Sequence, residues 1–281
     1  MRTLSFICFY FLLSAAAIAQ VKQVDTGKIR IDYTYKCRAF AEDTTYVEED
    51  VMLILGTEYS LYGNSKSYEI QKVLKQGATN NKNIQMGSMV SLIKNMPSSQ
   101  THNFKIIKNF TTHELYLTQS AFPMYTYSEE EIDFQWEVLG EQQEISGYQC
   151  IKAKGYYKGR DYVAWFTPEL PISEGPYKFY GLPGVILSIH DTGLQHIFEA
   201  KSISKTDEAI FHTKNEILSF EKFSKRHIKF FEKCQALYQN GKQVVYRDHV
   251  QELPGKSPEN IRENLLLSSL SNPIEIYHID K

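Results

Sequence analysis

Cysteine is scarce in this chain of 281 residues, which contains four. The first, Cys8, lies in an apolar N-terminal stretch, and the others are Cys37, Cys150 and Cys234. Without Cys8, the three cysteines that follow this stretch allow at most one internal disulfide, which excludes a small scaffold held together by several disulfides. Cys37 and Cys234 lie on apolar faces of predicted elements, and they fit either buried thiols or a Cys37–Cys234 bridge.

Glycine and proline are also few, at 15 and 9 residues, which argues against a collagen-like or low-complexity chain. Charge of one sign does not accumulate, since 31 basic and 33 acidic residues are interspersed and the net charge is −2. A nucleic-acid-binding domain carries a basic patch or stripe. The composition therefore argues against a nucleic-acid partner.

The common catalytic motifs are missing from the sequence. It contains no HExxH zinc helix, GxSxG nucleophile elbow, phosphate-binding loop, GxGxxG fingerprint or CxxC pair. An active site can be assembled in space without any of them, so their absence removes only the best-known enzyme classes. We expect neither a cofactor nor a metal ion, and we leave open whether the protein is an enzyme.

The N-terminus has the layout of a secretory signal peptide. Arg2 supplies the positive charge, Leu4 to Leu13 form the apolar core, and Ala17-Ile18-Ala19 is a small-residue cleavage site. The sequence thus predicts a signal peptide over residues 1–19, a mature chain from Gln20 and an exported protein in the periplasm or outside the cell. No later segment is a candidate for a transmembrane helix.

What the chain does have is aromatic residues, with 19 tyrosines and 16 phenylalanines. Ile29 to Cys37 alternates apolar and polar residues, which is typical of a strand with one buried face. Lys158-Gly159 and Asp191-Thr192-Gly193 each separate two strand-like runs and predict hairpins. Short connections of this kind predict antiparallel pairing.

One long amphipathic helix is predicted over Leu218–Asn240. Aromatic and aliphatic residues recur there at spacings of three and four, with lysine and arginine on the other side. We therefore predict an α+β fold: one domain over residues 20–281, dominated by a curved, mostly antiparallel sheet, half-barrel or bowl-like, packed on this helix. Residues 77–102 read as an inserted loop region, and residues from about 254 as a polar tail.

The segment from Gly147 to Asp191 is the best candidate for a functional site. Alternation places Tyr162 and Trp165 on opposite faces of one strand, and Tyr180 lies in a second aromatic run. If one face is concave and open, it forms an aromatic trough for an apolar, glycan or peptide ligand. The alternative is that all these rings pack in the core.

Arg160 is the charged candidate beside that trough. It could bind a carboxylate ligand through two parallel hydrogen bonds, or form a structural ion pair with Asp161 at the hairpin end. The predicted binding residues are thus Arg160, Tyr162, Trp165 and Tyr180.

The histidines and carboxylates are the remaining candidates for metal binding or acid–base chemistry. His190 and His196 would face each other across a five-residue hairpin loop, with Asp191 adding an oxygen, but zinc requires a further ligand that the sequence does not supply. The acidic runs Glu48-Glu49-Asp50 and Glu129-Glu130-Glu131 are typical of solvated turns or helix starts. We assign no catalytic or metal-ligating residue.

Gly181-Leu182-Pro183-Gly184 closes the aromatic segment. Pro183 and Gly184 fit the centre of a type II turn, with positive φ at Gly184, between strands 177–180 and 185–189. The runs GY-x-C-x-KA, AWF-TPELPI and GPYKF-x-GLPG-V-I-L, in this order, resemble the hallmark of the GLPGLI family, exported Bacteroidetes proteins of unestablished function. Val185 departs mildly from the family pattern. The resemblance implies a bowl-like fold, similar to an accessory domain of a bacterial peptide N-glycosidase.

Three functions are compatible with these observations. The first is a non-catalytic binding or accessory protein, which the family resemblance would associate with an outer-membrane transport or surface-assembly component. The second is a hydrolase with an unrecognised, metal-assisted site. The third is a structural interaction protein of the cell envelope that presents strand edges to a partner.

Overall fold

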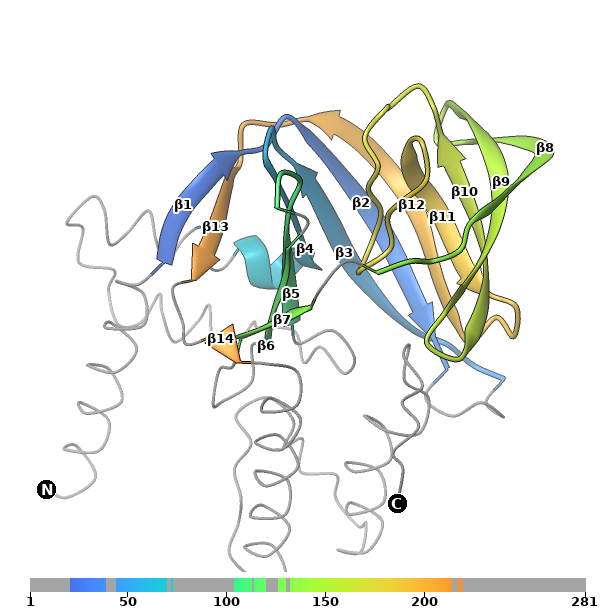
Figure 1. Ribbon diagram of the computed structural model, residues 1–281, viewed down its shortest axis with the longest axis horizontal. Coiled ribbons are helices and arrows are strands. Elements are labelled where there is room, and N and C mark those ends of the chain that lie inside the picture. The colour runs from blue at the N-terminus through green and yellow to red at the C-terminus, as the bar shows by residue number, and fades with distance from the viewer. Residues whose placement is uncertain are drawn as a thin grey trace, which may run out of the picture.

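The computed structural model describes residues 21–38, 44–69, 72, 104–112, 114–119, 126–129, 132–213 and 217–218. These residues form 14 strands in two sheets (Figure 1). The strands are β1 (Val21–Thr26), β2 (Ile29–Cys37), β3 (Val47–Leu55), β4 (Tyr59–Asn64), β5 (Phe104–Asn109), β6 (Leu115–Gln119), β7 (Thr126–Glu129), β8 (Glu137–Ile145), β9 (Tyr148–Tyr157), β10 (Arg160–Thr167), β11 (Val185–Asp191), β12 (His196–Lys205), β13 (Ala209–Thr213) and β14 (Ile217–Leu218).

The larger sheet has 12 strands in the order β14-β7-β6-β5-β4-β3-β2-β12-β11-β10-β9-β8, and β1 and β13 form a separate pair. From β3 to β7, each strand lies beside the one that precedes it in the sequence, towards one edge of the sheet. β8 forms the opposite edge, and β9 to β12 follow in order towards the middle, where β12 pairs with β2. Every pair is antiparallel except β14 with β7. The predicted antiparallel sheet is therefore confirmed.

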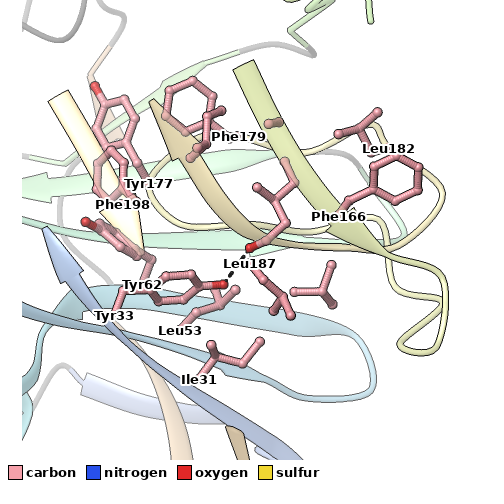
Figure 2. Packing of buried hydrophobic residues seen from close by; sticks show 14 of the residues in the cluster. Ile31, Tyr33, Leu53, Tyr62, Phe166, Tyr177, Phe179, Leu182, Leu187 and Phe198 are labelled. Carbon is pink, nitrogen blue, oxygen red and sulfur yellow. Dashed lines mark hydrogen bonds between the residues drawn. The ribbon is translucent and has the colours of Figure 1, made fainter. Parts of the chain in front are cut away.

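The two faces of the larger sheet are covered differently. Its inner face carries Tyr33, Tyr62 and Phe198 into the main core, and Figure 2 shows these rings packed with Tyr177 and Phe179. In the described residues, a second, smaller core covers the outer face near β3, β4 and β5, where Ile210 of β13 packs. The apolar run of β3 is buried on both faces for this reason.

The predicted α+β fold is wrong for the part of the chain that the structure describes. No helical segment there reaches seven residues, and the longest described one is the short helix at residues 65–69. Leu218, the expected first residue of the long helix, lies in β14. Residues 219–240 of that helix, the signal peptide, residues 77–102 and the tail from 254 lie outside the described residues.

The two predicted hairpins are present. Lys158 and Gly159 join β9 to β10 with φ angles of 41° and 86°, the left-handed values of a type I′ turn. β11 and β12 form the second hairpin, in which Ile189 pairs with Phe198. In the described ranges, no helix is both long and apolar enough to cross a membrane.

The turn at Pro183 differs from the predicted one. The amide of Gly184 donates to the carbonyl oxygen of Leu182 at 2.8 Å, which is the hydrogen bond of a γ-turn centred on Pro183. The φ angle of Gly184 is positive, at 159°, but lies far from the value near 80° of a type II turn. Residues 177–180 are not a strand, so the predicted hairpin around this turn is wrong.

Replacing Gly184 with alanine is expected to lower the free energy of unfolding by about 3 kcal/mol. A β-carbon there would lie 2.1 Å from the carbonyl oxygen of Thr167 and 2.7 Å from its carbonyl carbon, and backbone atoms cannot rotate away. Urea denaturation measures the change. Gly140→Ala is the control, because nothing lies within 4 Å of its β-carbon position. Equal stability of the two variants would contradict the steric account.

Candidate functional site

Residues 168–184, here called the plug segment, fill the space beneath the inner face of the sheet. The segment contains no strand, but its backbone is anchored to the start of β11. The amide of Val185 donates to Leu170 at 3.1 Å and the amide of Ile186 donates to Glu174 at 2.8 Å. These bonds satisfy backbone groups that would otherwise be buried without partners.

The plug segment carries its aromatic and aliphatic side chains into the main core. Phe179 is fully buried, with ring centroids 4.8 Å from Tyr162 and 6.1 Å from Phe198. Tyr177 meets Tyr62 edge-on at 6.4 Å. Figure 2 shows Tyr177, Phe179 and Leu182 of this segment over the inner strands that carry Tyr62 and Phe198. Where the trough was expected, the structure has a packed aromatic core.

A buried ion pair fastens the plug segment to β5. Lys108 Nζ lies 2.5 Å from Glu174 Oε2, and both side chains are almost fully buried. Ser60 donates to the same carboxylate at 3.3 Å, and Lys108 also donates to the carbonyl oxygen of Phe179 at 3.3 Å. Burial lowers the pKa of Lys108 and raises the pKa of Glu174. Our sequence reasoning missed this pair.

A signal for Lys108 was nevertheless present in the sequence. Phe104, Ile106 and Lys108 share one face of β5 by alternation, a pattern that places a lysine on the same face as residues of the main core. Glu174 gave no comparable signal, because the plug segment has no periodicity.

The four predicted binding residues lie in different environments. Tyr162 is buried in the main core, and Tyr180 is a partly exposed residue of the plug segment whose hydroxyl oxygen accepts a hydrogen bond from the amide of Ile132 at 2.6 Å. Trp165 lies on the opposite face from Tyr162, as alternation predicted. The structure therefore does not bring these four side chains together on one open surface.

Arg160 is buried and pairs with a residue other than the expected one. Its guanidinium donates to Asp191 Oδ2 at 3.0 Å and to Gln195 Oε1 at 2.7 Å. Asp191 Oδ1 accepts the amides of Gln195 and His196, each at 2.7 Å. Asp161 is exposed and lies on the other face of β10. The Arg160–Asp191 pair thus closes the β11–β12 hairpin.

The two histidines of the possible metal site are separated by the sheet. His190 pairs with Ile197 rather than with His196, so their side chains point to opposite faces. His196 is buried, with Nδ1 2.8 Å from the hydroxyl of Tyr35, whereas His190 lies on the outer face. Across the described ranges, no three His, Cys, Asp or Glu side chains gather as metal ligands would.

Only part of the two acidic runs lies in the described residues. In the run on β3, Glu48 and Asp50 are exposed, and the carboxylate of Asp50 forms an ion pair with Lys201. Glu129 ends β7, and Glu130 and Glu131 lie outside the described residues.

Among the cysteines, Cys150 is a free thiol whose pKa is raised to about 11 by burial. Cys37 is also buried, and Cys234 lies outside the described residues. The structure therefore does not test the Cys37–Cys234 bridge, which was the alternative to buried thiols.

The outer face of β9, β10 and β11 carries two accessible aromatic residues, Tyr156 and Trp165. Tyr156 is 50% exposed and pairs with Asp161, while Trp165 is partly exposed and pairs with Lys152 and Ser188. Lys152 Nζ lies 5.7 Å from the centre of the Trp165 ring. Directly paired residues share a face of the sheet, so these side chains form one surface, which we call the outer aromatic surface.

Comparison with known proteins yields a short family match and several similar solved structures. No curated protein matches the chain. The solved structures "Structure of PNGF-II in P21 space group" and "Structure of PNGF-II in C2 space group" match with TM-scores of 0.46 and identities of 17% and 16%. Each match covers 69% of this chain but 31% of the other, so this chain aligns with about a third of their length. Residues 157–188 match the model of the family described as "Protein of unknown function (Porph_ging)", and the resemblance read from the GLPG hallmark is confirmed over that stretch.

Proposed function

We propose that this protein is an exported, non-catalytic binding protein that holds a glycan chain on its outer aromatic surface. The observation that carries the proposal is the contrast between the two faces of β10. Tyr162 and Phe166 on the inner face are buried in the core, whereas Trp165 on the outer face is partly exposed and Tyr156 beside it is half exposed. A ligand that stacks on the aromatic rings of β10 therefore meets Trp165 on the outer face.

The neighbours of these rings support a glycan over a purely apolar ligand. Lys152, Lys154, Asp161 and Ser188 share the outer aromatic surface with Tyr156 and Trp165. A sugar ring presents C–H groups on its faces and hydroxyls around its edge. Aromatic rings with a few placed polar groups satisfy both kinds of contact.

The spacing of the rings supports a chain over a single sugar. Tyr156 pairs with Asp161, and Trp165 follows four residues later along β10. Four residues of strand span about 13 Å. One sugar ring cannot touch both aromatic residues at this separation, whereas an extended oligosaccharide can.

Export is the second part of the proposal. It depends on residues 1–19 acting as a signal peptide, which would place the outer aromatic surface in the periplasm or outside the cell. There the protein would act on a polysaccharide of the envelope, as an accessory to an outer-membrane transport or surface-assembly component.

Affinity electrophoresis through gels that contain single soluble polysaccharides tests the binding proposal. We expect migration to be retarded by at least one polymer, and Trp165→Ala to weaken that binding about tenfold, equivalent to 1.4 kcal/mol. Tyr156→Ala should act in the same direction.

Leu194→Ala is the matched control, because Leu194 is another exposed apolar residue, in the β11–β12 connection. It should leave the binding unchanged. Absence of retardation in a broad panel, or equal binding by Trp165→Ala and the unmodified protein, would contradict the proposal.

A further inference from the structure

We propose that β8 is a docking edge to which an extended strand of a partner protein, carrying basic side chains, adds by backbone pairing. Among the strands that the structure describes, β8 is the last of the larger sheet and β9 is its one neighbour. Its nine residues are exposed except for the partly buried Leu139 and Ile145. Its second edge therefore faces solvent, and an added strand would pair with it.

The acidic residues of β8 indicate the charge of the partner strand. Glu137 pairs with Lys154 of β9, and Glu141 Oε2 lies 2.7 Å from Lys152 Nζ. Glu137 shares the outer face with its register partner Lys154. Glu141 lies where the register of β8 with β9 shifts, and its ion pair with Lys152 brings its carboxylate to the same face. Because opposite charges stabilise directly paired strands, a strand on the free side of β8 is favoured when it places lysine or arginine beside these glutamates.

The inner side of β8 supplies an apolar contact. Val138 is 51% exposed and pairs with the buried Ala153, which places it on the inner face at the edge of the main core. A partner strand that alternates basic and apolar residues would cover Val138 while its basic residues approach Glu137 and Glu141.

The same charges argue against a second copy of this chain as the occupant. Two β8 edges would bring acidic residues of both copies together, and like charges that face each other destabilise a pair of strands. Charged residues on an edge strand are a common way to prevent such self-pairing. Pairing of β8 with β8 of a second copy is thus disfavoured, whereas pairing with a basic strand is favoured.

The test uses a fluorescein-labelled ten-residue peptide in which lysine and valine alternate. Fluorescence anisotropy with the full mature protein should give saturable binding, and a peptide with glutamate in place of lysine should bind at least tenfold more weakly. A third peptide carries N-methyl groups on alternate amides, so it keeps the charges but loses the backbone hydrogen bonds. It should also bind at least tenfold more weakly.

Variants of the protein locate the site. Glu137→Gln with Glu141→Gln should weaken binding of the lysine peptide at least tenfold, whereas Glu199→Gln, an exposed outer-face residue of β12, should not. Equal binding of the N-methylated peptide would show simple charge attraction and overturn the proposal. The proposal would also be overturned by unchanged binding to the double variant, or by no binding at all.

Discussion

Lys108→Met is expected to lower the free energy of unfolding by about 3–5 kcal/mol, because it leaves the buried carboxylate of Glu174 without its cation. Glu174→Leu should lower the free energy of unfolding by a similar amount, because it leaves the buried ammonium group of Lys108 without its carboxylate partner. The double variant Lys108→Met with Glu174→Leu should be more stable than either single variant, because a buried ion pair replaced by apolar side chains costs little. Urea denaturation of the four proteins measures this cycle.

The pH dependence of the Lys108→Met variant follows from the same pair. Burial already raises the pKa of Glu174 in the folded protein against the attraction of Lys108, and removing the lysine raises it further. The folded state then holds its proton to higher pH than the unfolded state. Stability of the variant is greatest below the unfolded pKa of glutamate, about 4.3, and falls as pH rises toward the folded pKa.

We therefore expect the deficit of Lys108→Met relative to the unmodified protein to be smaller at pH 4.5 than at pH 7.5. A deficit that is the same at both values, or a double variant less stable than both single variants, would contradict the buried pair as described.

Phe179→Ala is expected to cost about 3–5 kcal/mol, as is usual for a fully buried phenylalanine. Phe179 is the centre of the packing between the plug segment and the sheet, with its ring near those of Phe134, Tyr157, Tyr162, Tyr177 and Phe198. Thermal and urea denaturation measure the loss. Tyr156→Ala, at an exposed site, should change stability by less than about 0.5 kcal/mol.

A loss below about 1 kcal/mol for Phe179→Ala would mean that the site collapses freely, and the plug segment would not then be a fixed part of the core.

Strand alternation was the part of the fold that the sequence predicted well. The predicted strand Ile29–Cys37 has the same bounds as β2, and the turn at Lys158-Gly159 is where it was expected. Both depend on neighbours in sequence: apolar residues every second position, and a glycine where the backbone must be left-handed. Such local information suffices for antiparallel hairpins.

The burial of the plug segment could not be predicted in this way. Its residues follow no period, and it is held by contacts distant in sequence, such as Glu174 with Lys108. The aromatic residues of the hallmark were recognised, but their side of the sheet was open to two interpretations. For Tyr162 and Phe179 the structure decides in favour of the core.

The predicted pairing of His190 with His196 was wrong by one residue, because it too depends on contacts distant in sequence. A five-residue loop would place His190 opposite His196, but the observed pairing is His190 with Ile197. The carboxylate of Asp191 accepts two amides of the chain that enters β12, and Arg160 of β10 holds that carboxylate. A one-residue shift moves a side chain to the other face of a sheet.

Hydroxyl-radical footprinting of the free, folded protein, read by mass spectrometry, tests the central claim that the inner aromatic residues are closed by the plug segment and the outer ones are open. We predict rapid oxidation of Tyr156, intermediate oxidation of Trp165, and protection of Tyr162 and Phe179 to the level of fully buried Phe198. Oxidation of Tyr162 and Phe179 at the rate of Tyr156 would contradict it, because the inner face would then be an open trough.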